Sequence, residues 1–148
     1  MRIYLIPGLG FNPRIFEKLD LDDVELVCLD WLEPLSSKES IEEYAARMLG
    51  LMDVSTEPLI LAGHSMGGMV CQEISRLTPV KKVILLSSVL KRAELPYHLR
   101  IFKQLGVHHT FTKQMLFASF PFWARFHGYN RPEDRALFRD MVKQKSNK

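Results

Sequence analysis

Apolar positions in the first 90 residues fall into four short runs, separated by polar or glycine-rich stretches. The runs span residues 2–6, 24–29, 58–62 and 83–86. The last two show no polar alternation, which is typical of strands covered on both faces of a parallel sheet. We therefore predict four strands, the first of which ends in a tight turn at Pro7-Gly8-Leu9-Gly10.

Helical patterns lie between these runs. Ser40 and Glu43 form a capping-box pattern that predicts a helix over residues 41–52. Apolar residues recur at helical spacing over residues 69–77, and Pro79 ends that helix. Strands that alternate with helices in this way predict an α/β fold, with a parallel sheet and helices packed on it.

The pattern changes after Ser88. Residues 96–144 contain no convincing strand and are rich in Phe, Leu, Lys and Arg, with breaks at Gly106, Pro121 and Arg131-Pro132. They predict three helical pieces. We expect one domain over residues 1–148, with the sheet core in residues 1–90 and a helical cap-like segment in residues 91–148.

The composition is that of an ordinary globular domain, with 148 residues of which 47% are hydrophobic and 25% charged. Charge is distributed unevenly: residues 1–90 carry 8 Lys/Arg and 13 Asp/Glu (net −5), whereas residues 91–148 carry 12 and 4 (net +8). The basic residues are interleaved with Phe, Leu and Trp, as on the outer faces of amphipathic helices, and no nucleic-acid-binding motif accompanies them. We expect a solvated basic face and no nucleic-acid partner.

Cysteines, apolar run lengths and histidine spacing bear on location and cofactors. Cys28 and Cys71 do not form the dense pattern of a disulfide scaffold, and we expect both to be reduced core thiols. No run approaches the roughly 20 apolar residues of a membrane span, so no span is expected and a cytoplasmic location is the default. His108-His109 has no Cys or carboxylate at ligand spacing beside it. We expect no metal and no cofactor.

One motif carries chemistry. Gly63-His64-Ser65-Met66-Gly67 matches G-x-S-x-G and lies between a predicted strand and a predicted helix, as a serine nucleophile elbow requires. Such a turn exposes the serine hydroxyl, and only glycine leaves room at Gly63 and Gly67, while Gly68 eases packing of the helix behind. We predict Ser65 to be the catalytic nucleophile. His64 is expected to be a packing and orienting residue and not the base, because it adjoins the nucleophile in sequence and would point away across the turn.

Two backbone amides are candidates for stabilising an oxyanion at this serine. The Met66 amide lies at the predicted helix N-terminus and points the same way as the serine hydroxyl. A second donor can come from the early loop, where Gly8 and Gly10 let the backbone come close and the Leu9 amide can face Ser65.

The order strand, P-G-L-G loop, strand, helix, strand, G-H-S-M-G-G, helix, strand resembles the N-terminal two-thirds of an α/β-hydrolase. The resemblance covers residues 2–88, and residues 89–148 are similar only to the helical cap that many members insert. It implies a parallel-sheet α/β-hydrolase core of three αβα layers with a C-terminal helical cap-like segment. It also implies oxyanion amides at Leu9 and Met66, and a serine esterase-like hydrolase acting on a small carboxylic ester, thioester or amide. A pocket bounded by Leu9, Met66 and the aromatic residues of the predicted cap should prefer an apolar acyl group.

The acid and the histidine that follow the serine in this family have no clear counterpart. The candidates after Ser65 all lie in the predicted helical segment: Glu94, Glu133, Asp134 and Asp140 for the acid, and His98, His108, His109 and His127 for the base. Some relatives carry the acid just after the strand that here ends near Ser88, which favours Glu94. None of the histidines follows a predicted strand.

Single-domain α/β enzymes commonly run to roughly 200 residues or more. We therefore expect this chain to stop before the acid and the histidine, whether by shortening, by a frameshift, or because another polypeptide supplies them. Activity would then require self-association or a complementing C-terminal part. A second hypothesis stays open: a degenerate hydrolase that serves as a ligand- or partner-binding module.

Overall fold

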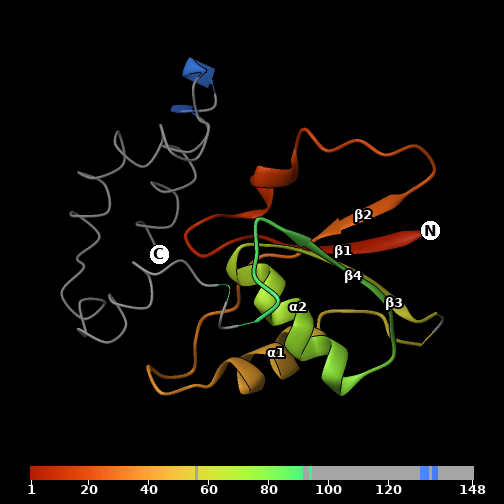
Figure 1. Cartoon of the computed structure of the whole chain (residues 1–148), viewed down its shortest axis with the longest axis vertical. Helices are drawn as coiled ribbons and strands as arrows, with labels where there is room; N and C mark the ends of the chain where they lie inside the picture. The colour runs from red at the N-terminus through yellow and green to blue at the C-terminus, as the bar shows by residue number, and fades with distance from the viewer. Residues whose placement is uncertain (56, 92–93, 95–130, 134, 137–148) are drawn as a thin grey trace. The chain divides into compact units, whose positions relative to one another are not determined.

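The computed structural model describes residues 1–55, 57–91, 94, 131–133 and 135–136 (Figure 1). The chain forms two compact units, Met1–Leu90 and Lys91–Lys148, and each is described by itself. In the second unit the Arg135 amide donates a hydrogen bond to the Arg131 carbonyl at 3.2 Å, and the described residues around it are helical. Most of the helical pieces predicted over residues 96–144 lie outside the described residues.

The first unit is built on a parallel four-stranded sheet in the order β2-β1-β3-β4. All four predicted strands are present: β1 (Arg2–Ile6), β2 (Glu25–Cys28), β3 (Leu59–His64) and β4 (Val80–Leu86). β4 begins directly after Pro79, earlier than the apolar run indicated. Its first residues include Lys81 and Lys82, which are part of the strand although they are exposed. Since the strands are parallel, their carboxyl ends meet at one edge of the sheet.

Two helices connect the strands, α1 (Ile41–Leu49) and α2 (Met66–Leu77). The predicted capping box is present at α1: the Glu43 amide donates to Ser40 Oγ at 3.2 Å, and the Ser40 amide donates to Glu43 Oε2 at 2.8 Å. α1 ends at Leu49 and not at residue 52, because the Gly50 amide turns back onto the Arg47 carbonyl.

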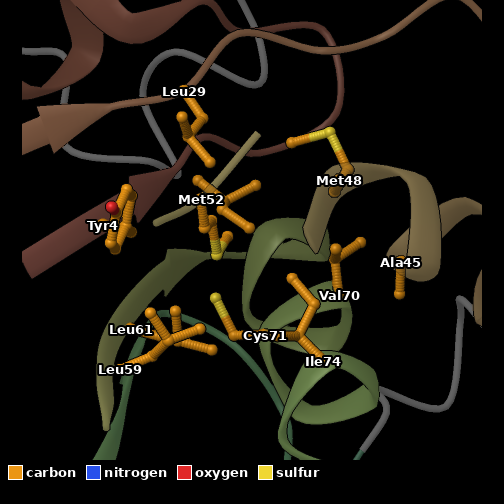
Figure 2. Close-up of a cluster of buried hydrophobic side chains, with 11 residues drawn as sticks. Tyr4, Leu29, Ala45, Met48, Met52, Leu59, Leu61, Val70, Cys71 and Ile74 are labelled. Carbon is orange, nitrogen blue, oxygen red and sulfur yellow. The ribbon is translucent and has the colours of Figure 1, made fainter. Parts of the chain in front are cut away.

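Both helices cover the same face of the sheet, and their apolar sides form the main core with every second strand residue (Figure 2). This core includes Tyr4, Ile6, Leu29, Ala45, Met48, Met52, Leu59, Leu61, Val70, Cys71 and Ile74. The opposite face holds a smaller cluster with Phe16 of the 3₁₀-helix η1 (Pro13–Phe16), an element that the sequence pattern did not predict. The predicted parallel-sheet α/β core is therefore confirmed.

The two cysteines differ in their surroundings. Cys71 is buried in α2, as expected, and burial raises the pKa of its thiol to about 12. Cys28 is exposed, so the expectation of a core thiol is wrong there. Its strand, β2, is one of the two edge strands of the described sheet, so Cys28 has a neighbouring strand on one side only. Among the described residues, no helix has both the length and the apolar character needed to cross a membrane.

Candidate active site

Ser65 occupies the sharp turn between β3 and α2. Its backbone has φ 51° and ψ −119°, a conformation that residues other than glycine rarely adopt and that costs roughly 1–3 kcal/mol. The Ser65 amide donates to the Leu86 carbonyl at 2.9 Å, which ties the turn to the end of β4. The serine itself is exposed. The surrounding contacts thus hold a strained serine at the carboxyl edge of the sheet.

The glycines around Ser65 allow backbone to touch backbone. A Cβ on Gly63 would collide with the backbone of Gly67 and Gly68 on the first turn of α2. A Cβ on Gly67 would collide with the carbonyl groups of Ile6 and Pro7. The start of α2 therefore packs directly on the end of β1, and this close approach explains why both positions are glycine.

The early loop lies beside this serine. The Phe11 amide donates to the Gly8 carbonyl at 3.0 Å, and Gly10 takes φ 83°, as a glycine in such a tight turn can. A Cβ on Gly8 would lie 3.2 Å from Ser65 Cβ and 2.6 Å from His64 Nδ1. The structure therefore brings together the two glycine-containing segments that the sequence singled out. They can lie this close because glycine at position 8 has no side chain.

Two side chains flank the loop tip. Leu9 is 68% exposed and presents an apolar surface beside the serine turn. The His64 ring packs edge-on against Phe11, with ring centroids 5.4 Å apart at an interplanar angle of 83°. This aromatic contact agrees with a packing role for His64.

Three residues that the sequence did not single out bond to the carbonyl groups of this site. Trp31 Nε1 donates to the Gly8 carbonyl at 3.1 Å, and Ser88 Oγ donates to the Ser65 carbonyl at 2.6 Å. Gln72 Nε2 links α2 to the segment after β4 by donating to the carbonyls of Gly68, at 3.2 Å, and Val89, at 2.8 Å. Trp31 and Ser88 follow β2 and β4, the strands beside β1 and β3. Their position directly after a strand was the only feature of the sequence that could have indicated a place in this site.

Trp31 is itself held by neighbours. Its ring lies against Tyr44, with centroids 5.8 Å apart, and the Tyr44 hydroxyl donates to the Leu32 carbonyl at 2.8 Å. Burial raises the pKa of Tyr44. The Arg47 guanidinium lies over the Tyr44 ring and pairs with Glu39 at 2.7 Å, which holds the pKa of that carboxyl below its usual value.

The acid and base candidates belong to the second unit. The Glu94 carboxylate accepts a hydrogen bond from the Lys91 amide at 3.4 Å, and Glu133 is exposed. The remaining candidates lie outside the described residues: His98, His108, His109, His127, Asp134 and Asp140. Within the part of the chain that the structure describes, no three His, Cys, Asp or Glu side chains gather in a way that could hold a metal ion.

A parallel sheet with a strained serine at the turn between a buried strand and the following helix is typical of the α/β-hydrolase fold. The profile of the Alpha/beta hydrolase family matches residues 3–146, and the chain belongs to that family.

Two solved structures are similar to the chain. A probable hydrolytic enzyme from Pseudomonas aeruginosa PAO1 has a TM-score of 0.64 and 18% identity over 95% of this chain and 50% of its own. The RedJ thioesterase of the prodiginine biosynthetic pathway in Streptomyces coelicolor has a TM-score of 0.50 and 18% identity over 97% and 63%. The chain thus spans half the length of the first structure and under two-thirds of the second. None of the curated proteins matches it.

Proposed function

We propose that this chain is a serine hydrolase, or the amino-terminal part of one, that cleaves a small carboxylic ester, thioester or amide with Ser65 as its nucleophile. The observation that carries the proposal is the strained backbone of Ser65, φ 51° and ψ −119°, between β3 and α2. A residue is kept in such a conformation when its surroundings over-determine it, as at catalytic turns. The hydrolytic enzyme and the thioesterase with similar folds support the same reaction class.

In the proposed reaction, Ser65 Oγ attacks the substrate carbonyl carbon while a base takes the hydroxyl proton. The electron pair of the C=O bond moves onto oxygen, and the amides of Leu9 and Met66 donate hydrogen bonds to that oxyanion. Collapse of the tetrahedral intermediate re-forms the C=O bond and breaks the bond to the leaving group, which takes the proton from the base and departs as the alcohol, thiol or amine. Water then hydrolyses the acyl-serine, which releases the carboxylic acid and restores the serine hydroxyl. Among the described residues, neither the Leu9 nor the Met66 amide donates a turn, loop or cap hydrogen bond to a backbone carbonyl, which suits this role.

The base is the part of the proposal that rests on sequence alone. His98, His108, His109 and His127 are the histidines that follow Ser65, and Glu94 is the favoured acid. The alternative source is a second copy or a complementing C-terminal polypeptide. Without a base the serine hydroxyl stays a poor nucleophile, because removal of a triad member typically lowers the rate by several orders of magnitude.

The acyl group that we propose is apolar. Leu9 places an exposed apolar side chain next to the serine turn, and desolvation of such a surface by an acyl chain is favourable. An intact form should therefore hydrolyse butanoyl or hexanoyl p-nitrophenyl esters with a higher kcat/KM than the acetyl ester. Equal kcat/KM values across the series would contradict an apolar acyl site.

The nucleophile is tested by labelling the folded chain with a fluorophosphonate probe. Ser65→Ala should abolish labelling. Ser87→Ala is the matched control, because Ser87 is also exposed, has φ 49° and directly follows the adjacent strand β4. Labelling of the wild type and of Ser87→Ala, but not of Ser65→Ala, would support both the nucleophile and the presence of a base.

A folded chain that is not labelled at all would contradict the proposal for the chain as it stands. The binding-module hypothesis would then apply, and a ligand or partner would be expected to contact the basic second unit. In that case reversing the charge of Arg135 together with Arg139 should weaken binding, whereas Ser65→Ala should leave it unchanged.

A further inference from the structure

Each amide proposed as an oxyanion donor belongs to a peptide group whose carbonyl is hydrogen-bonded elsewhere. The Leu9 N–H shares a peptide group with the Gly8 carbonyl, and the Met66 N–H shares one with the Ser65 carbonyl. The described chain has no cis peptide bond, so N–H and C=O point in opposite directions in both groups. Whatever fixes the direction of the carbonyl therefore fixes the direction of the N–H.

The Gly8 carbonyl accepts two hydrogen bonds from different parts of the chain. One comes from the Phe11 amide at 3.0 Å, within the same turn. The other comes from Trp31 Nε1 at 3.1 Å, on the segment that follows β2. The turn bond joins Gly8 only to its own loop. The indole bond links that tip to a half-buried ring packed on Tyr44.

The Ser65 carbonyl is bonded in the same manner. The Gly68 amide donates to it at 3.0 Å within the first turn of α2. Ser88 Oγ donates to it at 2.6 Å from the segment that follows β4. Gln72 holds this segment against α2 through its bond to the Val89 carbonyl.

We infer that Trp31 and Ser88 are positioning residues that aim the Leu9 and Met66 amides at the oxyanion. The inference rests on the proposed function of Ser65. Preorganised donors stabilise the transition state because they need no reorientation as charge develops on the substrate oxygen. A hydrogen bond accepted at the carbonyl also polarises the N–H of the same peptide group, which strengthens it as a donor.

The inference is tested with two variants that each remove one donor and little else. Trp31→Phe keeps an aromatic ring against Tyr44 but has no N–H, and Ser88→Ala loses only the hydroxyl. The matched controls are Tyr4→Phe, which removes a hydroxyl that accepts a hydrogen bond from the Asp53 amide at 2.9 Å, and Ser87→Ala next to Ser88. Thermal unfolding followed by circular dichroism confirms that each variant is folded.

The first readout is the rate constant of fluorophosphonate labelling of Ser65, because the phosphoryl oxygen takes the place of the carbonyl oxygen. We expect each positioning variant to lower it on the order of 5-fold, the worth of one ordinary hydrogen bond. Removing an oxyanion donor outright costs about 100-fold or more. Both controls should label at the wild-type rate. Wild-type rates in Trp31→Phe and Ser88→Ala would overturn the inference.

The second readout does not need activity. In ¹⁵N–¹H spectra of the full chain, Trp31→Phe should shift the Leu9 amide, and Ser88→Ala should shift the Met66 amide, with neither control doing so. If the wild type is not labelled, the proposed function has failed. The amide resonances then test separately whether Trp31 and Ser88 position the Leu9 and Met66 amides. Unshifted Leu9 and Met66 resonances would overturn the inference whatever the labelling result.

Discussion

Gly67→Ala has two opposing effects on the free energy of unfolding. The added carbon disturbs close packing, which lowers it, and alanine has a higher helix propensity than glycine, which raises it. Gly67 lies inside α2, where propensity alone predicts that alanine stabilises the helix by up to about 1 kcal/mol. The added Cβ, however, would collide with the backbone carbonyls of Ile6 and Pro7. These carbonyl oxygens belong to the backbone and cannot move aside as the end of a flexible side chain could. The substitution must therefore push β1 and α2 apart.

Forcing an extra carbon into such a contact costs about 3 kcal/mol, at the upper end of the usual range. Subtracting the propensity gain leaves a net loss of about 2 kcal/mol in the free energy of unfolding. For a domain of this size that corresponds to a Tm lower by about 5–10 °C. Chemical and thermal denaturation followed by far-UV circular dichroism measure both quantities.

Gly10→Ala is the matched control in the early loop. A Cβ on Gly10 meets no atom within 4 Å, so the substitution adds only the strain of alanine at φ 83°, about 1 kcal/mol. Gly67→Ala should therefore be the more destabilising of the two. A Gly67→Ala chain as stable as the wild type, or more stable, would show that α2 and β1 do not pack as closely as described, and the argument from close approach would be wrong.

Three further predictions concern the same unit. Ser40→Ala should lower the free energy of unfolding by about 1 kcal/mol through loss of the helix cap, as measured by urea denaturation, and an unchanged midpoint would contradict that role. Because burial raises the pKa of Cys71 to about 12, only Cys28 should react with a thiol reagent at pH 8 in the native chain, and both should react in guanidinium; equal native rates would refute the burial of Cys71. The pKa of Glu39 is lowered by Arg47, so their pairing stabilises the fold above the ordinary Glu value of 4.5, and this stability is lost as pH falls through the lower folded pKa. The stability gap between wild type and Glu39→Gln should therefore close in acid, and a gap that does not vary with pH would contradict the pairing.

Local features of the sequence predicted much of this unit. Four apolar runs became four strands, and the Ser40 capping box became the start of α1, because strand and cap signals act over a few neighbouring residues. The G-x-S-x-G motif likewise marked the position of the strained turn at Ser65. Element ends were less accurate: α1 stops at Leu49 although Met52 is also buried, since burial continues past the helix through the turn that follows.

Contacts between distant segments could not be predicted in the same way. The hydrogen bonds from Trp31 to Gly8 and from Ser88 to Ser65 each span 23 residues. They exist because β2 lies beside β1 and β4 beside β3, and the order of strands in a sheet does not follow from the apolar pattern of each strand. The exposure of Cys28 has the same origin, since its strand lies at the outer edge of the described sheet.

The sequence by itself determined the α/β class, the parallel strands and the residues of the serine turn, because each depends on short-range periodicity and on the backbone freedom of glycine. Only the tertiary structure decided that Gly8 lies beside Ser65, that β1 packs on the glycines of α2, and that Trp31 and Ser88 bond to the carbonyls of the site. These contacts depend on which strands are neighbours, and that order is fixed by the packing of the whole unit and not by any one segment.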